Sequence, residues 1–153
     1  MDEREFKART KKLGLDVIRL VEALPKTRSA DILGRQLLRS ATSVGANYRA
    51  ACRGKSSLDV IAKLAIVEEE GDETLYWLEL LREANIAPGS SVRDLWDSAD
   101  SIVAMTVASI KTMRRRISQS KAPVPVPAIQ NPESKTDAMA PAKPSAVDRS
   151  KED

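Results

Sequence analysis

Apolar residues recur through most of the chain with alternating steps of three and four. The first run includes Leu13, Val17, Leu20 and Leu24, at steps of four, three and four, with Phe6 seven residues before Leu13, and Pro25 follows it. Steps of this kind place apolar side chains on one face of an α-helix, and a proline stops a helix. The pattern therefore predicts a first helix over residues 3–23.

Three more helices are predicted from the same spacing. The second covers residues 29–53 with Ser29 as its N-cap, the third covers 56–84 and the fourth covers 90–117. No segment alternates between apolar and polar residues with a period of two, so no strand is predicted. Four helices joined by short turns predict an all-α fold, an antiparallel up-down-up-down four-helix bundle.

The chain changes in composition after the fourth helix. Residues 119–153 carry six of the eight prolines and no large apolar cluster. Such a segment buries too little apolar surface to offset the entropy lost on ordering. We therefore expect a four-helix bundle over residues 1–118 and a Pro-rich disordered tail over 119–153. The stretch PVPVP favours a polyproline II helix that docks on a partner, but a solvated tail is the preferred interpretation.

The residue types exclude the commonest enzyme and metal chemistries. Histidine is absent and Cys52 is the only cysteine. The chain therefore lacks a histidine general base, a Cys/His zinc set, an internal disulfide and the Glu-x-x-His pairs of di-metal bundles. We expect a protein that is not an enzyme and has no cofactor and no metal. Cys52 falls on the apolar side of its helix and is predicted to lie in the core.

The charged N-terminus and the lack of long apolar runs indicate where in the cell the protein is expected. The first residues, MDEREFKARTKK, contain no apolar signal segment, and no run approaches the roughly 18–20 apolar residues that span a bilayer. These features predict a cytoplasmic protein without a membrane partner.

The second predicted helix carries a polar stripe where a bundle helix usually carries leucine. Its members recur at steps of four, three and four, and they are Gln36, Ser40, Ser43 and Asn47. Arg39 flanks this stripe, and the third helix places Glu73 in an apolar setting. We expect a buried Arg39–Glu73 ion pair that fixes the helix register, with Asn47 or Ser43 completing its hydrogen bonds. Loss of one partner of a fully buried pair costs roughly 3–5 kcal/mol.

The third predicted helix is apolar over more than one face. Ile66, Trp77 and Leu80 widen its apolar arc beyond the roughly 100° stripe of a simple surface helix. Contact with another copy of the chain would bury this arc. A monomer with Trp77 in its core is an equally weighted alternative.

Two motifs in these helices resemble those of a known family. They are Gln36-Leu37-Leu38-Arg39 followed by Ser43 and Asn47, and Glu73-Thr74-Leu75-Tyr76-Trp77-Leu78. The motifs resemble those of the four-helix bundle proteins encoded in intervening sequences of 23S rRNA genes, and the resemblance covers about residues 6–117. The chain departs from the family at Tyr48-Arg49-Ala50-Ala51, where Ile-Ala-Glu-Gly is frequent.

The resemblance implies a partner as well as a fold. Related proteins are the accessory variability proteins of diversity-generating retroelements, which form basic pentamers that bind nucleic acid and a reverse transcriptase. By resemblance, this chain is expected to form a homo-oligomer such as a pentamer. It is expected to act as an adaptor for RNA or DNA, for a reverse transcriptase or for another protein.

Clustered lysines and arginines are the candidate nucleic-acid contacts. Residues 1–120 hold 20 Lys and Arg against 17 Asp and Glu, so the net charge of +3 is mild and its distribution matters more. The candidates are Arg35, Arg49, Arg53 and Lys55, which are expected to form one patch, Arg4, Lys7 and Lys11 on the first helix, and Arg114, Arg115 and Arg116 at the end of the fourth. The alternatives are that these are solvated faces and that the protein is a protein–protein interaction module without a nucleic-acid role.

Overall fold

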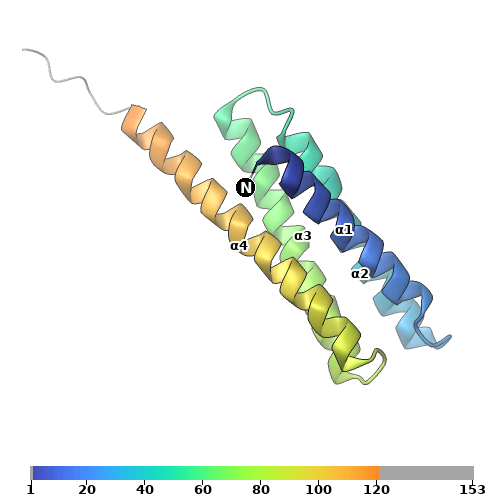
Figure 1. Ribbon diagram of the computed structural model, residues 1–153. Helices are drawn as coiled ribbons and strands as arrows, with labels where there is room; N and C mark the ends of the chain where they lie inside the picture. Colours follow the sequence, from blue (N-terminus) through green and yellow to red (C-terminus); the bar gives the residue numbers. More distant parts are fainter. Residues whose placement is uncertain (1, 121–153) are drawn as a thin grey trace, which may run out of the picture. The chain divides into compact units, whose positions relative to one another are not determined.

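The computed structural model describes residues 2–120, which form four helices (Figure 1). The helices are α1 (Glu3–Glu22), α2 (Arg28–Ala51), α3 (Ser57–Glu83) and α4 (Gly89–Ser120). Consecutive helices run in opposite directions, and residues 2–120 contain no strand. The predicted all-α, antiparallel four-helix bundle is confirmed. Residues 119 and 120 continue α4, and the remainder of the predicted tail, including PVPVP, lies outside the described residues.

Short polar side chains begin three of the helices. Asp2, Thr27 and Ser56 are the N-caps of α1, α2 and α3, and each accepts a hydrogen bond from the backbone N–H three residues later. The expected cap at Ser29 is wrong, because Thr27 already has the extended backbone that a cap requires and α2 begins at Arg28. The helix α4 likewise begins at Gly89, before the predicted start.

The core consists of aliphatic side chains from all four helices. The most deeply buried of these are Leu13, Val17, Leu37, Val44, Val67, Leu78, Leu81 and Ile102. A second, smaller cluster joins Ala51, Ile61, Leu64 and Ile110. It lies where α2 ends and α3 begins, beside the last turns of α4.

A hydroxyl pair crosses the α2–α3 contact inside this apolar core. The hydroxyl oxygens of Thr74 and Ser40 lie 3.0 Å apart, and each also lies within hydrogen-bond distance of a carbonyl of its own helix, Thr74 2.8 Å from the Glu70 carbonyl and Ser40 3.2 Å from the Leu37 carbonyl. Both side chains are fully buried. Buried hydroxyls need hydrogen-bond partners, so this pair favours one register of α2 against α3. Ser40, a member of the predicted polar stripe, thus lies at the α2–α3 contact with Thr74 as its partner.

We expect Thr74→Val to lower the free energy of unfolding by about 1 kcal/mol, because it removes the hydrogen bonding of a buried hydroxyl with little change in the volume of the side chain. Ser40→Ala should cost a similar amount. The double variant should cost less than the sum of the two, since each single change already removes the bond between the two hydroxyls and the sum counts that loss twice. Urea denaturation of the four proteins tests the coupling, and strictly additive losses would contradict it.

The four helices do not contact one another equally. The helix α1 packs closely on α2 and much less on α4. Figure 1 shows the last turns of α4 extending past the start of α1. At this end of the bundle, the start of α1, the end of α2, the start of α3 and the end of α4 come together. The α1–α2 and α3–α4 loops lie at the opposite end.

Candidate nucleic-acid interface

Positive charge is concentrated at the end of the bundle where α1 begins. This end comprises residues 2–10, 46–67 and 108–120, and we call it the basic end. It holds 11 Lys and Arg against 4 Asp and Glu, whereas the rest of residues 2–120 hold 9 against 13. A mild net charge for the whole chain therefore conceals a strong polarity along the bundle axis.

Most of the predicted contact residues meet at the basic end. They are Arg4, Lys7, Arg49, Arg53, Lys55, Arg114, Arg115 and Arg116, and Lys11 adjoins them on α1. All of these except Lys7 are exposed. Lys7 pairs with Glu3, while the arginines of this group and Lys55 form no ion pair within residues 2–120. Exposed and unpaired cations are available to phosphate groups.

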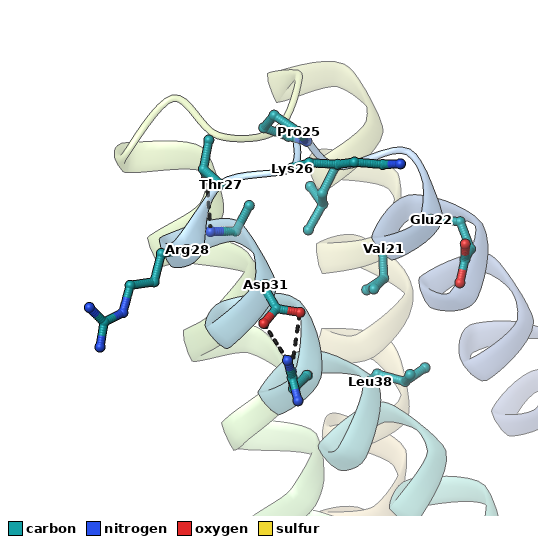
Figure 2. Close-up of a pocket in the computed structure, with 11 residues that line it drawn as sticks. Val21, Glu22, Pro25, Lys26, Thr27, Arg28, Asp31 and Leu38 are labelled. Atoms are coloured by element: carbon teal, nitrogen blue, oxygen red, sulfur yellow. Dashed lines mark hydrogen bonds and ion pairs between the residues drawn. The ribbon is translucent and has the colours of Figure 1, made fainter.

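Arg35 does not join this group, so the prediction of one patch containing Arg35 and Arg49 is wrong. The two residues are separated by 14 positions of α2, about 21 Å along a helix axis. Arg35 instead pairs with Asp31 beside a cavity of about 550 Å³ at the α1–α2 loop (Figure 2). The hydrogen bond from Arg35 lowers the pKa of the Asp31 carboxyl, and Asp31 in turn raises the pKa of Arg35.

A cleft of about 320 Å³ opens at the basic end between the start of α1 and α4. Its lining residues come from all four helices and from the cap of α1. They are Asp2, Glu3, Phe6, Tyr48, Leu64, Met105, Thr106, Ala108 and Ser109. The rings of Phe6 and Tyr48 pack against each other with centroids 4.3 Å apart. No sequence pattern predicts this cleft, because it forms only where helices distant in the chain diverge.

The environment of Tyr48 raises the pKa of its phenol. Burial is the main cause that raises the pKa of Tyr48, and the neighbouring Cys52, Glu3 and Asp2 raise it further. Cys52 is half-buried and forms the C-cap of α2, so the prediction of a core cysteine is only partly met.

The predicted Arg39–Glu73 ion pair forms, but it is not buried. The side chains are 51% and 46% exposed, and Arg39 also lies 3.4 Å from the carboxylate of Glu70. Gln36 accepts a hydrogen bond from Arg39. Burial was the wrong expectation because long side chains extend to the surface and keep their charged ends in water.

The remaining members of the polar stripe do not complete this network. The Asn47 amide donates to the Ser43 carbonyl over 3.0 Å within α2 itself. The expected hydrogen bonds from Asn47 or Ser43 to the ion pair are therefore wrong, since Asn47 lies two turns beyond Arg39 and is occupied locally.

We expect Arg39→Met to lower the free energy of unfolding by about 1 kcal/mol or less, because exposed ion pairs contribute little. Urea denaturation measures the change, and Glu69→Gln provides a control that removes an exposed carboxylate from the same helix as Glu73. A loss of 3 kcal/mol or more would show that the network behaves as a buried one.

The outward face of α3 exposes apolar side chains. Of the predicted oligomer contacts, Ile66 is 40% exposed, whereas Trp77 and Leu80 are half-buried and Trp77 packs on the main core. The sequence interpretation missed Leu58 and Tyr76, which are 65% and 52% exposed. They lie eighteen residues apart, about five helical turns, and therefore face the same side.

The described residues carry neither a metal cluster nor a membrane span. Within residues 2–120, no three His, Cys, Asp or Glu side chains converge so as to hold a metal ion. None of the helices over the same range has an apolar stretch long enough to cross a bilayer.

These observations define a small four-helix bundle protein with one basic end and a cleft in that end. Residues 3–108 match the model of the family described as "23S rRNA-intervening sequence protein". The chain belongs to this family.

One solved structure similar to this chain is a protein of unknown function from the S23 ribosomal protein family of Bacteroides thetaiotaomicron. It shares 30% sequence identity with a TM-score of 0.68, and the similarity covers 72% of this chain and 99% of that one. No curated protein matches the chain.

Proposed function

We propose that the protein is a homo-oligomeric adaptor that binds RNA or DNA through the basic end and has no enzymatic activity. The observation that carries this proposal is the excess at that end, 11 Lys and Arg against 4 Asp and Glu. The name of the family, with its reference to 23S rRNA, is consistent with a nucleic-acid setting.

The physical basis of binding is the release of counterions from phosphates. Each lysine or arginine that neutralises a phosphate releases condensed cations, so that clustered charges bind even without reading the sequence. The helix α4 favours this role because Arg114, Arg115 and Arg116 lie on turns that extend past α1 (Figure 1). Three consecutive residues point about 100° apart, and these exposed arginines therefore present charge on several sides of one helix.

Self-association would multiply this surface. The outward face of α3 carries the large hydrophobic side chains of Leu58, Ile66 and Tyr76. In a monomer these side chains are exposed to water. Burial of such side chains against a second copy is favourable. A ring such as a pentamer would place several basic ends close together, and multivalent contacts bind more tightly than one.

A protein–protein interaction module is the second candidate function, and the same exposed face of α3 favours it. In this case a partner such as a reverse transcriptase would cover Leu58 and Tyr76, and the basic end would be a solvated surface. Both candidates place the protein in the cytoplasm, where the thiol of Cys52 stays reduced.

Salt dependence distinguishes the two candidates. Fluorescence anisotropy with labelled 20-nucleotide RNA and DNA would be recorded at 50–300 mM KCl. We expect the logarithm of the association constant to fall linearly with the logarithm of salt, with a slope of about −0.7 per phosphate contact on a single strand. The proposal fails if neither nucleic acid binds at 50 mM KCl.

A further inference from the structure

The cleft at the basic end is lined by apolar side chains and by the carboxylates of Asp2 and Glu3, and Lys7 pairs with Glu3. Phe6, Tyr48, Leu64 and Met105 supply two aromatic rings, an aliphatic side chain and a thioether to its lining. Its volume of about 320 Å³ exceeds that of one nucleobase. Aromatic side chains bind unpaired bases by stacking, whatever the base, because every base has a π-face.

The polar groups at the cleft are mainly hydrogen-bond acceptors. Asp2 caps α1 with one carboxylate oxygen and Glu3 pairs with Lys7 through one oxygen, which leaves a second oxygen on each carboxylate. The hydroxyls of Thr106 and Ser109 both donate over 2.8 Å to backbone carbonyls of α4. These hydroxyls therefore present lone pairs rather than protons to the cleft.

The hydrogen-bond acceptors that line the cleft favour a ligand that presents hydrogen-bond donors along one edge. Guanine presents its ring N–H and its exocyclic amino group side by side, and a carboxylate can accept both at once. Uracil presents a single N–H between two carbonyl groups. Its carbonyl oxygens would face the carboxylates, and the two would repel each other because both carry negative charge. Adenine and cytosine offer one amino group each and are intermediate.

We infer that this cleft holds one unpaired base, preferentially guanine, of a single-stranded nucleic acid whose phosphates lie on the surrounding cations. The inference rests on the proposed function and specifies its ligand. Lys7 pairs with Glu3 and so neutralises one of the two carboxylates, and the lysine and the three consecutive arginines of α4 follow Ser109 on the next turns of the helix. A duplex cannot supply the base, since its bases are stacked and paired.

The test compares 12-nucleotide RNAs by anisotropy at one salt concentration. The four ligands are oligouridine, oligouridine with one central guanosine, the same strand with inosine for guanosine, and a 12-base-pair duplex. We expect the guanosine strand to bind about tenfold tighter than oligouridine, as one stacked and hydrogen-bonded base allows. Inosine lacks the amino group and should lie between the two. A DNA version of each strand determines whether the sugar contributes.

Two variants separate the cleft from the charges around it. Ser109→Phe fills the cleft from an exposed position and should abolish the guanosine preference, so that the guanosine strand and oligouridine bind this variant with equal affinity. Glu3→Gln keeps the shape of the side chain and should reduce the preference. Far-UV circular dichroism and thermal unfolding verify that both variants fold.

The outcomes distinguish this inference from the proposed function. A guanosine preference that Ser109→Phe removes supports the inference. Equal affinity for the guanosine strand, oligouridine and duplex overturns it and leaves nucleic-acid binding intact. Failure of every ligand to bind overturns both.

Discussion

Replacing Arg114, Arg115 and Arg116 together by glutamine lowers the affinity for single-stranded nucleic acid by about tenfold to a hundredfold at 0.1 M salt. Each phosphate contact steepens the plot of the logarithm of the association constant against the logarithm of salt by about 0.7. One contact is therefore worth about 0.7 decades of affinity between 0.1 and 1 M salt. Two or three lost contacts therefore weaken binding by one to two decades. Anisotropy titrations over a range of salt measure both the affinity and the slope.

A matched control removes the same charge from the opposite end of the bundle. Lys26, Arg28 and Arg93 are exposed and lie near the α1–α2 and α3–α4 loops. Their replacement by glutamine also lowers the net charge by three. We expect this variant to lose less than threefold in affinity, because its charges lie far from the basic end and salt screens them. Equal losses in the two variants would contradict an interface at the basic end.

Gly71→Ala lowers the free energy of unfolding by about 1–3 kcal/mol, although alanine is the better helix former. A Cβ atom at Gly71 would lie 2.5 Å from Cγ2 of Val103, closer than atoms pack. Valine is stiff about its first side-chain torsion, so α3 and α4 must separate or Val103 must leave its rotamer. The gain of up to about 1 kcal/mol from helix propensity offsets only part of this cost. Urea denaturation measures the net loss.

A second substitution tests whether the clash with Val103 is the cause. Gly71→Ala combined with Val103→Ala should be more stable than the sum of the single changes predicts, because the shorter side chain makes room for the new methyl group. Gly89→Ala serves as a control, since no atom lies within 4 Å of the Cβ position there. Stability equal to or above wild type in Gly71→Ala alone would contradict the close α3–α4 contact.

The helices follow from the sequence because their signal is local and repeated. Phe6, Leu13 and Leu20 recur at steps that only a helix places on one face, and they are buried in the core. The exact starts are harder to predict, as the misplaced cap of α2 and the earlier start of α4 show. Thr27 and Ser29 both stand near the start of α2, and the extended backbone at Thr27 decides that Thr27 becomes the cap.

The polar stripe shows how far a pattern on one helix can be interpreted. The spacing of Ser40 within α2 indicates a contact with another helix, and this contact is observed. The spacing does not identify Thr74 as its partner, because threonine is compatible with both apolar and polar surroundings. The exposure of Arg39 and Glu73 depends on the paths of long side chains, which helix spacing does not specify.

The basic end depends on topology rather than on any one segment. Four stretches of the chain contribute to it, and their net charges add only once the antiparallel order of the helices brings them together. Arg35 was grouped with Arg49 because both lie on α2, but their positions along the helix axis separate them. The cleft has the same origin, since Glu3, Tyr48 and Met105 come together only in the folded bundle.

A native mass spectrum of the purified protein, recorded before and after nuclease treatment, tests the central proposal most directly. The proposal of a homo-oligomeric nucleic-acid adaptor predicts an assembly of several copies, five in a pentameric ring, with additional mass that nuclease removes. A monomer of 16.7 kDa with the same spectrum before and after nuclease would contradict it.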